Sequence, residues 1–527
     1  MIFSLSLAFP SERLPFGVSL MQLAVVCLVL AILLRIVQGV YIHPLKNVPG
    51  PLLAKISSIS VYLANLKGVR SHTLLNLHDK YGPYVRVGPN EVSISDPEMY
   101  RKIYTRGASI KEDSFYSSTR LTPPNENIFS MRNKAQHAAR RKMENDPYSL
   151  QAINQHEPVI WNKAHIFLKR IISEAAASSS HSVDVHPLCG LFSLEVICQV
   201  AFDNDLDAES TAPGLNFLHA MSQAAMITPL TDTFPLLAHT KLSESLPGII
   251  GKAFSQRRQW EETTRAIYTS FKRQSEQTGR GGKEKFLASP FVHKIDDFLG
   301  RRLTEDEGLE EAMGLAFAGS GTTSTTIVYI LYHLSRPENR AMQLRLREEL
   351  CSPDGSAASV TDLPYLNAVI KEAMRLNPSL MGTLPRILTT TVVADTDDDH
   401  VQAGTKHKPL VFPPGTRIAM QNYVHHRNPK VYPDPHSFNP DRWLGTTGSS
   451  SAAEKAFTPY SLGPRNCIGQ NLANLELRVA TALLFRNLDF RLNPTMREED
   501  MEMEDRFAAL VRGGKLLLDV ERLSPAA

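Results

Sequence analysis

The sequence predicts a mainly α-helical protein with a minor β portion, built as a single large domain behind an N-terminal transmembrane helix. An uncharged run at residues 16–34 indicates the membrane helix, and helical patterns dominate residues 150–350. Short strand-like runs, VRVGPNEVSIS at 85–95 and KLLLDV at 515–520, supply the β portion. Because no internal repeat and no boundary is visible after residue 50, we expect one body rather than several domains.

The N-terminal run FGVSLMQLAVVCLVLAILL would span roughly 28 Å as a helix, close to the thickness of a bilayer core. Arg35, Lys46 and Lys55 follow it, so the positive-inside rule places the bulk of the chain in the cytosol. A cleaved signal peptide is the alternative, but the run is long for one and no A-x-A site follows. We expect four parts: a short lumenal N-terminus at 1–15, an anchor at 16–34, a proline-rich hinge at 35–51 and a large globular body at 52–527.

Charge, cysteines and absent motifs narrow the function. A net charge of +3 over 527 residues gives no reason to expect a nucleic-acid partner. Five cysteines without C-x-x-C spacing do not form a disulfide framework and are typical of a reducing compartment. The sequence contains no H-E-x-x-H, G-x-S-x-G, P-loop or G-x-G-x-x-G motif, so neither a hydrolase nor an intrinsic nucleotide site is indicated.

A long helix is predicted between Thr304, which forms a capping box with Glu307, and the stop at Pro337. Its middle, AFAGSGTTSTT at 316–326, holds two glycines and four threonines, which cost about 4 kcal/mol of helix propensity relative to alanine. Two interpretations stay open. The small residues could pack closely against another helix, or they could mark a break in the hydrogen-bond ladder where a hydroxyl and water approach a ligand.

A second predicted helix, LNAVIKEAMRLNPS at 366–379, places Glu372 and Arg375 on one face among apolar neighbours. The same E-x-x-R spacing occurs in two pairs that we expect to be exposed, Glu98/Arg101 and Glu262/Arg265. A third arginine, Arg442 in FNPDRW, follows. Near the C-terminus, YSLGPRNCIGQNLANLELRVA places Cys467 in a glycine-bounded turn that leads into a helix, whereas a structural cysteine more often lies within an apolar run.

These four motifs, in this order, resemble the cytochrome P450 family of membrane-anchored haem-thiolate monooxygenases. The resemblance runs from about residue 40 to the C-terminus, and is strongest to microsomal fungal members that serve secondary metabolism. It implies haem b as cofactor, bound by the loop Tyr460–Gly469, which matches F-x-x-G-x-R-x-C-x-G with tyrosine in the first position. Cys467 would be the axial ligand of the haem iron, and amides at a helix N-terminus would favour its thiolate.

The remaining haem contacts follow from the same resemblance. Gly463 and Gly469 would let the loop turn tightly and approach the porphyrin, and Tyr460 would shield the sulfur while adding a hydroxyl. Charged partners for the haem propionates are implied at four positions: Arg465, His137, Arg141 and Arg386. For His137, a plain position on a helix surface stays open.

The resemblance also assigns roles to the two helical motifs. Glu372, Arg375 and Arg442 would form a buried ion-pair triad that serves folding and haem incorporation. Ala318–Thr323 matches A-G-x-(D/E)-T-T, in which Thr322 would orient the water that protonates bound dioxygen. Gly321 stands where an acid is usual, so the start of the proton relay is missing. Ser320, Thr323 or a substrate hydroxyl could carry the proton instead.

The implied reaction inserts one oxygen atom from O2 into a lipophilic small molecule, by hydroxylation, epoxidation or a related oxidation. Electrons would come from NADPH through a membrane-bound NADPH–cytochrome P450 reductase that docks on a basic face near Arg465, at the cytosolic side of the endoplasmic reticulum membrane. Substrate contacts are implied at mainly apolar positions, each of which could equally be ordinary core: Phe317, Ala318, Thr322, Leu380, Met381, Thr383 and Leu384.

Because Gly321 replaces the usual acid, a peroxide-using, rearranging or nitric-oxide-reducing member of the family stays an alternative. A non-enzymatic haem carrier and a membrane-anchored hydrolase or binding protein are the remaining alternatives.

Overall fold

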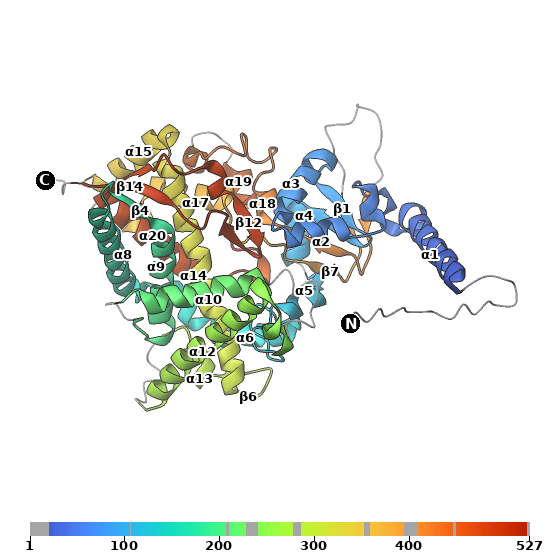
Figure 1. The fold of residues 1–527 in the computed structure, drawn as a ribbon, viewed down its shortest axis with the longest axis horizontal. Helices are drawn as coiled ribbons and strands as arrows, with labels where there is room; N and C mark the ends of the chain where they lie inside the picture. The colour runs from blue at the N-terminus through green and yellow to red at the C-terminus, as the bar shows by residue number, and fades with distance from the viewer. Residues whose placement is uncertain are drawn as a thin grey trace, which may run out of the picture.

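The computed structural model describes residues 20–523, except 106, 207–209, 228–240, 278–285, 353–358, 395–408 and 446–449. The expected lumenal N-terminus at 1–15, and the first residues of the expected anchor, lie outside the described residues. Figure 1 shows a helical body with smaller β portions and one helix, α1, standing away from it.

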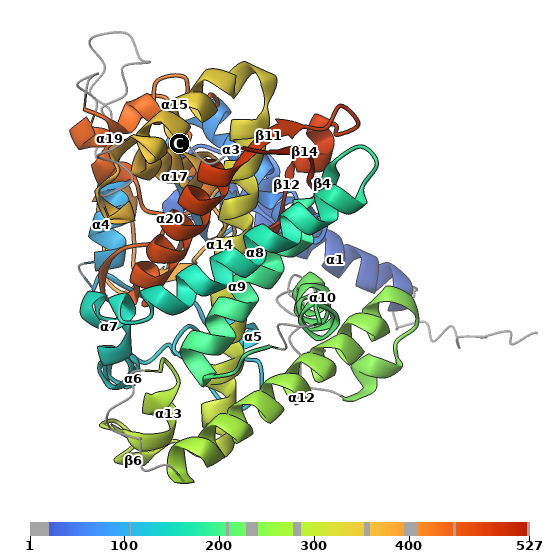
Figure 2. The same cartoon turned by 90° about the vertical axis from the view of Figure 1, so that its left-hand side faces the viewer.

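Helices make up most of the described chain. Their bounds are α1 Leu20–Val37, α2 Ile59–Leu66, α3 Arg70–Tyr81, α4 Pro97–Thr105, α5 Asp113–Ser118, α6 Lys134–Glu144, α7 Leu150–Asn154, α8 Glu157–Ala177, α9 Val185–Phe202, α10 Ala212–Met226, α12 Gly248–Gln277, α13 Ser289–His293, α14 Glu305–Ser335, α15 Arg340–Cys351, α17 Pro364–Leu376, α18 Asn422–His425, α19 Ser450–Ala456 and α20 Gln470–Asn487. The main core is built where α8, α9, α14, α17 and α20 pack together (Figure 2).

The strands form small sheets rather than a central layer. Their bounds are β1 Tyr84–Gly88, β2 Glu91–Ile94, β3 Ser109–Lys111, β4 Ser182–Asp184, β5 Ile295–Asp296, β6 Arg301–Arg302, β7 Arg386–Leu388, β8 Val392–Ala394, β9 Leu410–Phe412, β10 Arg417–Ala419, β11 Leu488–Leu492, β12 Met503–Arg506, β13 Ala508–Val511 and β14 Leu517–Arg522. The largest sheet has the order β1-β2-β10-β7-β3. The hairpin predicted at 85–95 is confirmed as the antiparallel pair β1–β2.

The predicted long helix is α14, and its capping box is confirmed. The Thr304 hydroxyl accepts from the Glu307 amide at 3.3 Å, and the Glu307 carboxylate accepts from the Thr304 amide at 2.7 Å. The helix is continuous through its glycines. A Cβ on Gly319 would lie 2.6 Å from a side-chain carbon of Ile197 on α9, so this glycine allows close helix packing, whereas a Cβ on Gly321 would meet nothing within 4 Å. Close helix packing therefore applies to Gly319, and open space for a ligand applies to Gly321. The helix is not broken at either glycine.

The N-terminal helix extends further than the sequence indicated. It runs to Val37 and continues through a π-helical turn, Gln38–Ile42, beyond the predicted end at Leu34. Among the described residues, two helices are long and apolar enough to cross a membrane. Val185–Phe202 is mostly buried core, whereas Met21–Ile42 is exposed along most of its length.

The proline-rich stretch is not a free spacer. Pro44–Asn47 forms a 3-10 turn, in which the His43 imidazole accepts from the Leu45 amide at 3.1 Å. The Leu45 side chain is fully buried in a cluster with Val48 and Phe412, next to the largest sheet. The N-terminal helix is therefore fastened to the body by buried apolar surface.

Candidate functional site

The cysteine turn is held between α4 and α20. The Cys467 amide donates to the Tyr460 carbonyl at 2.9 Å, and Gly469 is the N-cap of α20. Gly463 has φ +72, and a Cβ there would lie 2.7 Å from the Tyr104 carbonyl oxygen, so only glycine fits. The turn therefore depends on Gly463 for its contact with α4 as well as for its backbone conformation.

The Cys467 thiol is accessible, although protein surrounds it on several sides. Burial raises the pKa of this thiol, while the Gly469 amide and the Arg141 charge act in the opposite direction. The expected effect of the helix amides is therefore present, but burial outweighs it in the protein by itself. A bound metal ion deprotonates a coordinating thiol outright, so the ion itself would complete this site.

Tyr460 lies beside the cysteine, and its hydroxyl has a protein partner. It donates to Asn474 Oδ1 at 2.9 Å. Burial, followed by the neighbouring Cys467 charge, raises the pKa of Tyr460, so this residue is a neutral donor. The tyrosine that replaces the usual phenylalanine is thus fixed to α20.

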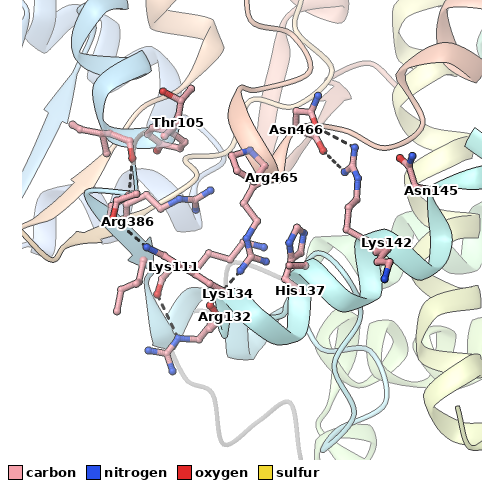
Figure 3. Close-up of a pocket in the computed structure, with 18 of the residues that line it drawn as sticks. Thr105, Lys111, Arg132, Lys134, His137, Lys142, Asn145, Arg386, Arg465 and Asn466 are labelled. Carbon is pink, nitrogen blue, oxygen red and sulfur yellow. Dashed lines mark hydrogen bonds between the residues drawn. The ribbon is translucent and has the colours of Figure 1, made fainter. Parts of the chain in front are cut away.

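A cavity of about 690 Å³ lies next to the cysteine turn, and cationic side chains line it (Figure 3). Lys111, Arg141, Arg386 and Arg465 come from four separate segments of the chain, and His137 of α6 joins them. Among the described residues, no carboxylate oxygen forms a salt bridge with any of these four cations. We call these four residues the cation cluster.

Neutral oxygens hold the cation cluster instead. Arg386 donates to the Tyr116 hydroxyl at 2.5 Å, Arg465 to the Met131 carbonyl at 2.7 Å, and Arg141 to the Asn466 carbonyl at 2.7 Å. Lys111 donates to the Phe129 carbonyl. The geometry thus positions four positive groups without neutralising them.

The electrostatic cost of this arrangement is visible in the pKa values. Burial, together with Arg465 and Arg386, lowers the pKa of Lys111 well below its usual value. Burial and Arg386 lower the pKa of Arg465 to about 10. Uncompensated buried charge is unfavourable unless an anion joins it. The two propionates of haem would supply that negative charge, so the residues present fit the group that the sequence implied.

His137 is buried rather than on a helix surface. Burial and the charges of Arg465 and Lys111 lower its pKa to about 3, so its imidazole is neutral near pH 7.

Sequence reasoning missed Lys111. It enters the cluster because β3 pairs with β7 in a register that sets Lys111 opposite Arg386. No local motif marks a lysine whose partner lies so far along the chain.

One face of α14 is open around Ala318 and Gly321. Ala318 is exposed, and the Thr322 hydroxyl donates to its carbonyl at 2.8 Å. Ser320 and Thr323 are buried, and the Ser320 hydroxyl donates to the Ala316 carbonyl at 2.8 Å. These two candidate proton carriers therefore do not lie on the open face.

The expected substrate contacts divide in the same way. Met381 is fully buried in the main core and Thr383 is 2% exposed, so the structure places both in ordinary packing. Leu384 packs against the second core cluster, and Leu380 forms a β-bridge with Ala508. The Phe317 ring faces Trp260 of α12 at 5.6 Å. Ala318 and Thr322 remain as the expected positions on the open face.

Aromatic residues that the sequence did not single out gather next to the cation cluster. Phe129 contacts Tyr116 and Phe507, with ring centroids 5.3 and 5.4 Å apart, and Phe115 contacts Phe507 at 5.9 Å. Phe507 has φ +76 in the turn between β12 and β13. The group is assembled from three distant segments, so no sequence pattern announces it.

The predicted triad is in place, with Glu372 and Arg375 on α17 and Arg442 in the 3-10 turn Pro440–Trp443. Arg375 Nε and Nη2 each donate to a Glu372 oxygen at 2.9 Å, and Arg442 Nε lies 3.3 Å from the same carboxylate. The Trp443 indole and the Asn439 amide complete the shell at 2.9 Å. Burial alone would raise the pKa of Glu372, but Arg375 and Arg442 outweigh it, so its pKa lies below the usual value.

The other two E-x-x-R matches form no ion pair of their own in the described chain. Arg101 donates to the Lys455 carbonyl at 2.6 Å, and Arg265 pairs with Glu261 and Asp306. Glu98 and Glu262 are exposed, as expected.

Comparisons with known proteins agree with this geometry. The family model for cytochrome P450 matches residues 54–518. The chain is 29% identical over 492 residues to the cytochrome P450 monooxygenase aflV of Aspergillus parasiticus, covering 90% of this chain and 91% of the relative. It is 28% identical over 484 residues to the monooxygenase stcB of Emericella nidulans, covering 89% and 87%. A solved structure, retinoic acid bound cyanobacterial CYP120A1, shares the fold with a TM-score of 0.66 at 18% identity, covering 85% of this chain and 93% of that chain.

The chain therefore belongs to the cytochrome P450 family, and its fold is the cytochrome P450 fold. It is an oxidoreductase, a haem-dependent monooxygenase similar to fungal members of the family. The non-monooxygenase alternatives raised by Gly321 are not favoured.

Proposed function

We propose that this monooxygenase binds haem b with Cys467 as the axial thiolate and with the cation cluster on the two propionates. The observation that carries this proposal is the set of buried and half-buried cations around a cavity next to Cys467, none of which forms a salt bridge with a carboxylate of the described residues. Guanidinium groups suit carboxylates, because their paired N–H groups match two oxygens. Neutral His137 adds a hydrogen-bonding group without further charge. Glu372, Arg375 and Arg442 would keep the proximal side folded around the cofactor.

When bound, the haem iron supplies the activation of dioxygen, and thiolate ligation favours cleavage of the O–O bond. On the side of α14, the role of the protein is to position a proton donor. We propose that the Thr322 hydroxyl, now donating to Ala318, turns to hold a water molecule on the open face. Since no carboxylate stands at position 321, the open space beside Gly321 admits that water or a substrate hydroxyl.

The electrons would come from NADPH through a separate reductase. The rim of the cavity carries Arg132, Lys134 and Lys142 outside the cation cluster, and the latter two are exposed. A basic rim attracts an acidic partner and steers its approach. We propose the membrane-bound NADPH–cytochrome P450 reductase as that partner, docking near Arg465.

The exposed apolar helix α1 supports attachment to a membrane. By the positive-inside rule, Arg35 near its C-terminal end supports an orientation with the body on the cytosolic side. We therefore propose a single-pass protein of the endoplasmic reticulum that acts on a lipophilic small molecule. Its similarity to fungal monooxygenases supports a step in secondary-metabolite biosynthesis.

The test is reconstitution of the purified haem-loaded protein with NADPH–cytochrome P450 reductase in lipid vesicles, under ¹⁸O2. The proposal predicts substrate-dependent NADPH consumption and one ¹⁸O atom per product molecule. Product that forms with peroxide but never with reductase and NADPH would overturn the proposed electron route.

A further inference from the structure

The segment between α5 and α6, residues 119–131, has no regular secondary structure, yet it joins two parts of the site. Asn127 lies against α14, with its Cβ 3.7 Å from where a Cβ on Gly314 would stand. Gly314 is one turn before Ala318 on the open face. Just after Asn127 in the chain, the Phe129 and Met131 carbonyls accept hydrogen bonds from Lys111 and Arg465 of the cation cluster. The segment therefore connects α14 with the proposed cofactor site.

One buried carboxylate holds this segment to α14. Glu310 is fully buried, and all of its hydrogen-bond donors in the described chain belong to the segment. The Leu121 amide donates at 2.9 Å, the Thr122 hydroxyl at 2.8 Å and the Asn127 side-chain amide at 2.6 Å, and the Thr122 amide also donates. Hydrogen bonds to a charged acceptor are about twice as strong as neutral ones.

An arginine on a second helix holds the same peptide groups from the other side. Arg257 of α12 donates to the Arg120 carbonyl at 2.8 Å and to the Leu121 carbonyl at 2.9 Å. Leu121 is therefore fixed through its N–H by Glu310 and through its C=O by Arg257. Figure 2 shows α12 crossing the N-terminal part of α14, where the two opposite charges attract each other.

The neighbouring Glu311 has a different task. Its carboxylate pairs with Arg140 of α6, and Arg140 also donates to Asp296 at 2.9 Å. From the segment, Glu311 accepts one hydrogen bond in the described chain, from the Ile128 amide at 3.0 Å. Glu311 thus joins regular elements of the body to one another. Glu310, in contrast, accepts hydrogen bonds from the irregular segment alone, although burying its charge is unfavourable.

We infer that Glu310 and Arg257 are positioning residues that clasp residues 119–131 closed over the substrate space, and thereby set how fast a bulky ligand enters and leaves. The inference rests on the proposed place of the substrate beside Ala318. When either charge is removed, the peptide groups around Leu121 lose charge-assisted bonds and the segment opens more often. A small ligand that passes without opening gains little from this change.

The test compares Glu310→Gln and Arg257→Gln with a matched control, Glu305→Gln, which removes an exposed carboxylate from the same helix. Hydrogen exchange of the haem-loaded proteins is followed in peptides covering 119–131, with Pro364–Leu376 of α17 as internal reference. In parallel, stopped-flow spectra give the association and dissociation rates of 4-phenylimidazole and of imidazole.

Both clasp variants are expected to speed exchange in 119–131 about tenfold, the effect of one charge-assisted hydrogen bond. Phenylimidazole rates should rise by a similar factor while imidazole rates change little. Arg257→Lys, which keeps the charge, should restore part of the slow exchange of the wild type.

If exchange in 119–131 rises no more than in Glu305→Gln, or equally in α17, the inference is overturned. If Glu310→Gln does not fold, the same measurements on Arg257→Gln test the inference, because Arg257 is partly exposed. Failure of the proposed cofactor site is distinct, because it would remove thiolate-haem absorption from the wild type.

Discussion

The triad and the cation cluster are two groups of charged side chains that are built in opposite ways. Around Glu372, two arginines, an indole and an amide satisfy the carboxylate, and its pKa falls. In the cation cluster, the hydrogen bonds seen in the described residues go to neutral oxygens, and the pKa values of Lys111 and Arg465 fall because the groups are buried and, to a smaller extent, because like charges repel. The first group is neutralised by protein side chains, whereas the second forms no salt bridge with any carboxylate that the structure describes.

The difference indicates what each group does. A buried charge that the protein itself neutralises stabilises the fold, and its removal leaves uncompensated partners. A buried charge that the protein leaves unpaired destabilises the empty chain and becomes favourable only with a ligand. Substitutions in the two groups should therefore change the stability of the haem-free chain in opposite directions.

The largest effect is expected for Glu372→Ala. Arg375 and Arg442 would be left buried without their carboxylate, which costs about 3–5 kcal/mol of unfolding free energy. Urea denaturation followed by circular dichroism measures this loss, with the exposed Glu98→Ala as control. A loss within 1 kcal/mol of that control would contradict the assignment of the triad to folding.

Arg386→Gln and Arg465→Gln should behave differently. Each removes one of several like charges, so the haem-free protein should keep or gain stability. Haem loss should nonetheless accelerate about tenfold, because a charge-assisted bond to a propionate disappears. Haem transfer to an excess of apomyoglobin measures the rate, with the exposed Arg491→Gln as control. Unchanged haem loss in both variants would remove the cation cluster from the cofactor site.

A pH effect should separate His137 from an ordinary surface histidine. Its pKa in the folded state is about 3, below the value of 6.5 for an unfolded chain, so the unfolded state binds more protons between these values. Stability should fall as pH drops through this window, by up to about 1.4 kcal/mol per pH unit from this group. His137→Gln should remove that part of the slope in urea titrations, whereas exposed His165→Gln should not. Identical slopes in wild type and His137→Gln would show that His137 is not buried in the haem-free protein.

The smallest effect is expected for Tyr460→Phe. The hydroxyl loses one hydrogen bond to Asn474, worth about 1 kcal/mol, while the ring stays beside the sulfur. Urea denaturation should show this small loss, and the thiolate-haem spectrum should persist. A collapse of that spectrum would show that the hydroxyl itself holds the cysteine turn.

The sequence was sufficient where a short motif carries the function and insufficient where distant segments meet. The capping box of α14, the triad and the cysteine turn could each be predicted, because their residues stand in local patterns with a clear physical reason. Lys111 and Glu310 could not, since one depends on the β3–β7 register and the other on a segment without secondary structure. Met381 lies close to a predicted motif, but core packing rather than spacing decides its place.

The most direct test of the account is the reduced, carbon-monoxide-bound difference spectrum of the haem-supplied protein, recorded beside Cys467→Ser. Thiolate ligation by Cys467 predicts a strongly red-shifted Soret band in the wild type that is lost in the variant. The same band in both proteins, or its absence from well-folded wild type, would contradict the assignment of Cys467 as the axial ligand.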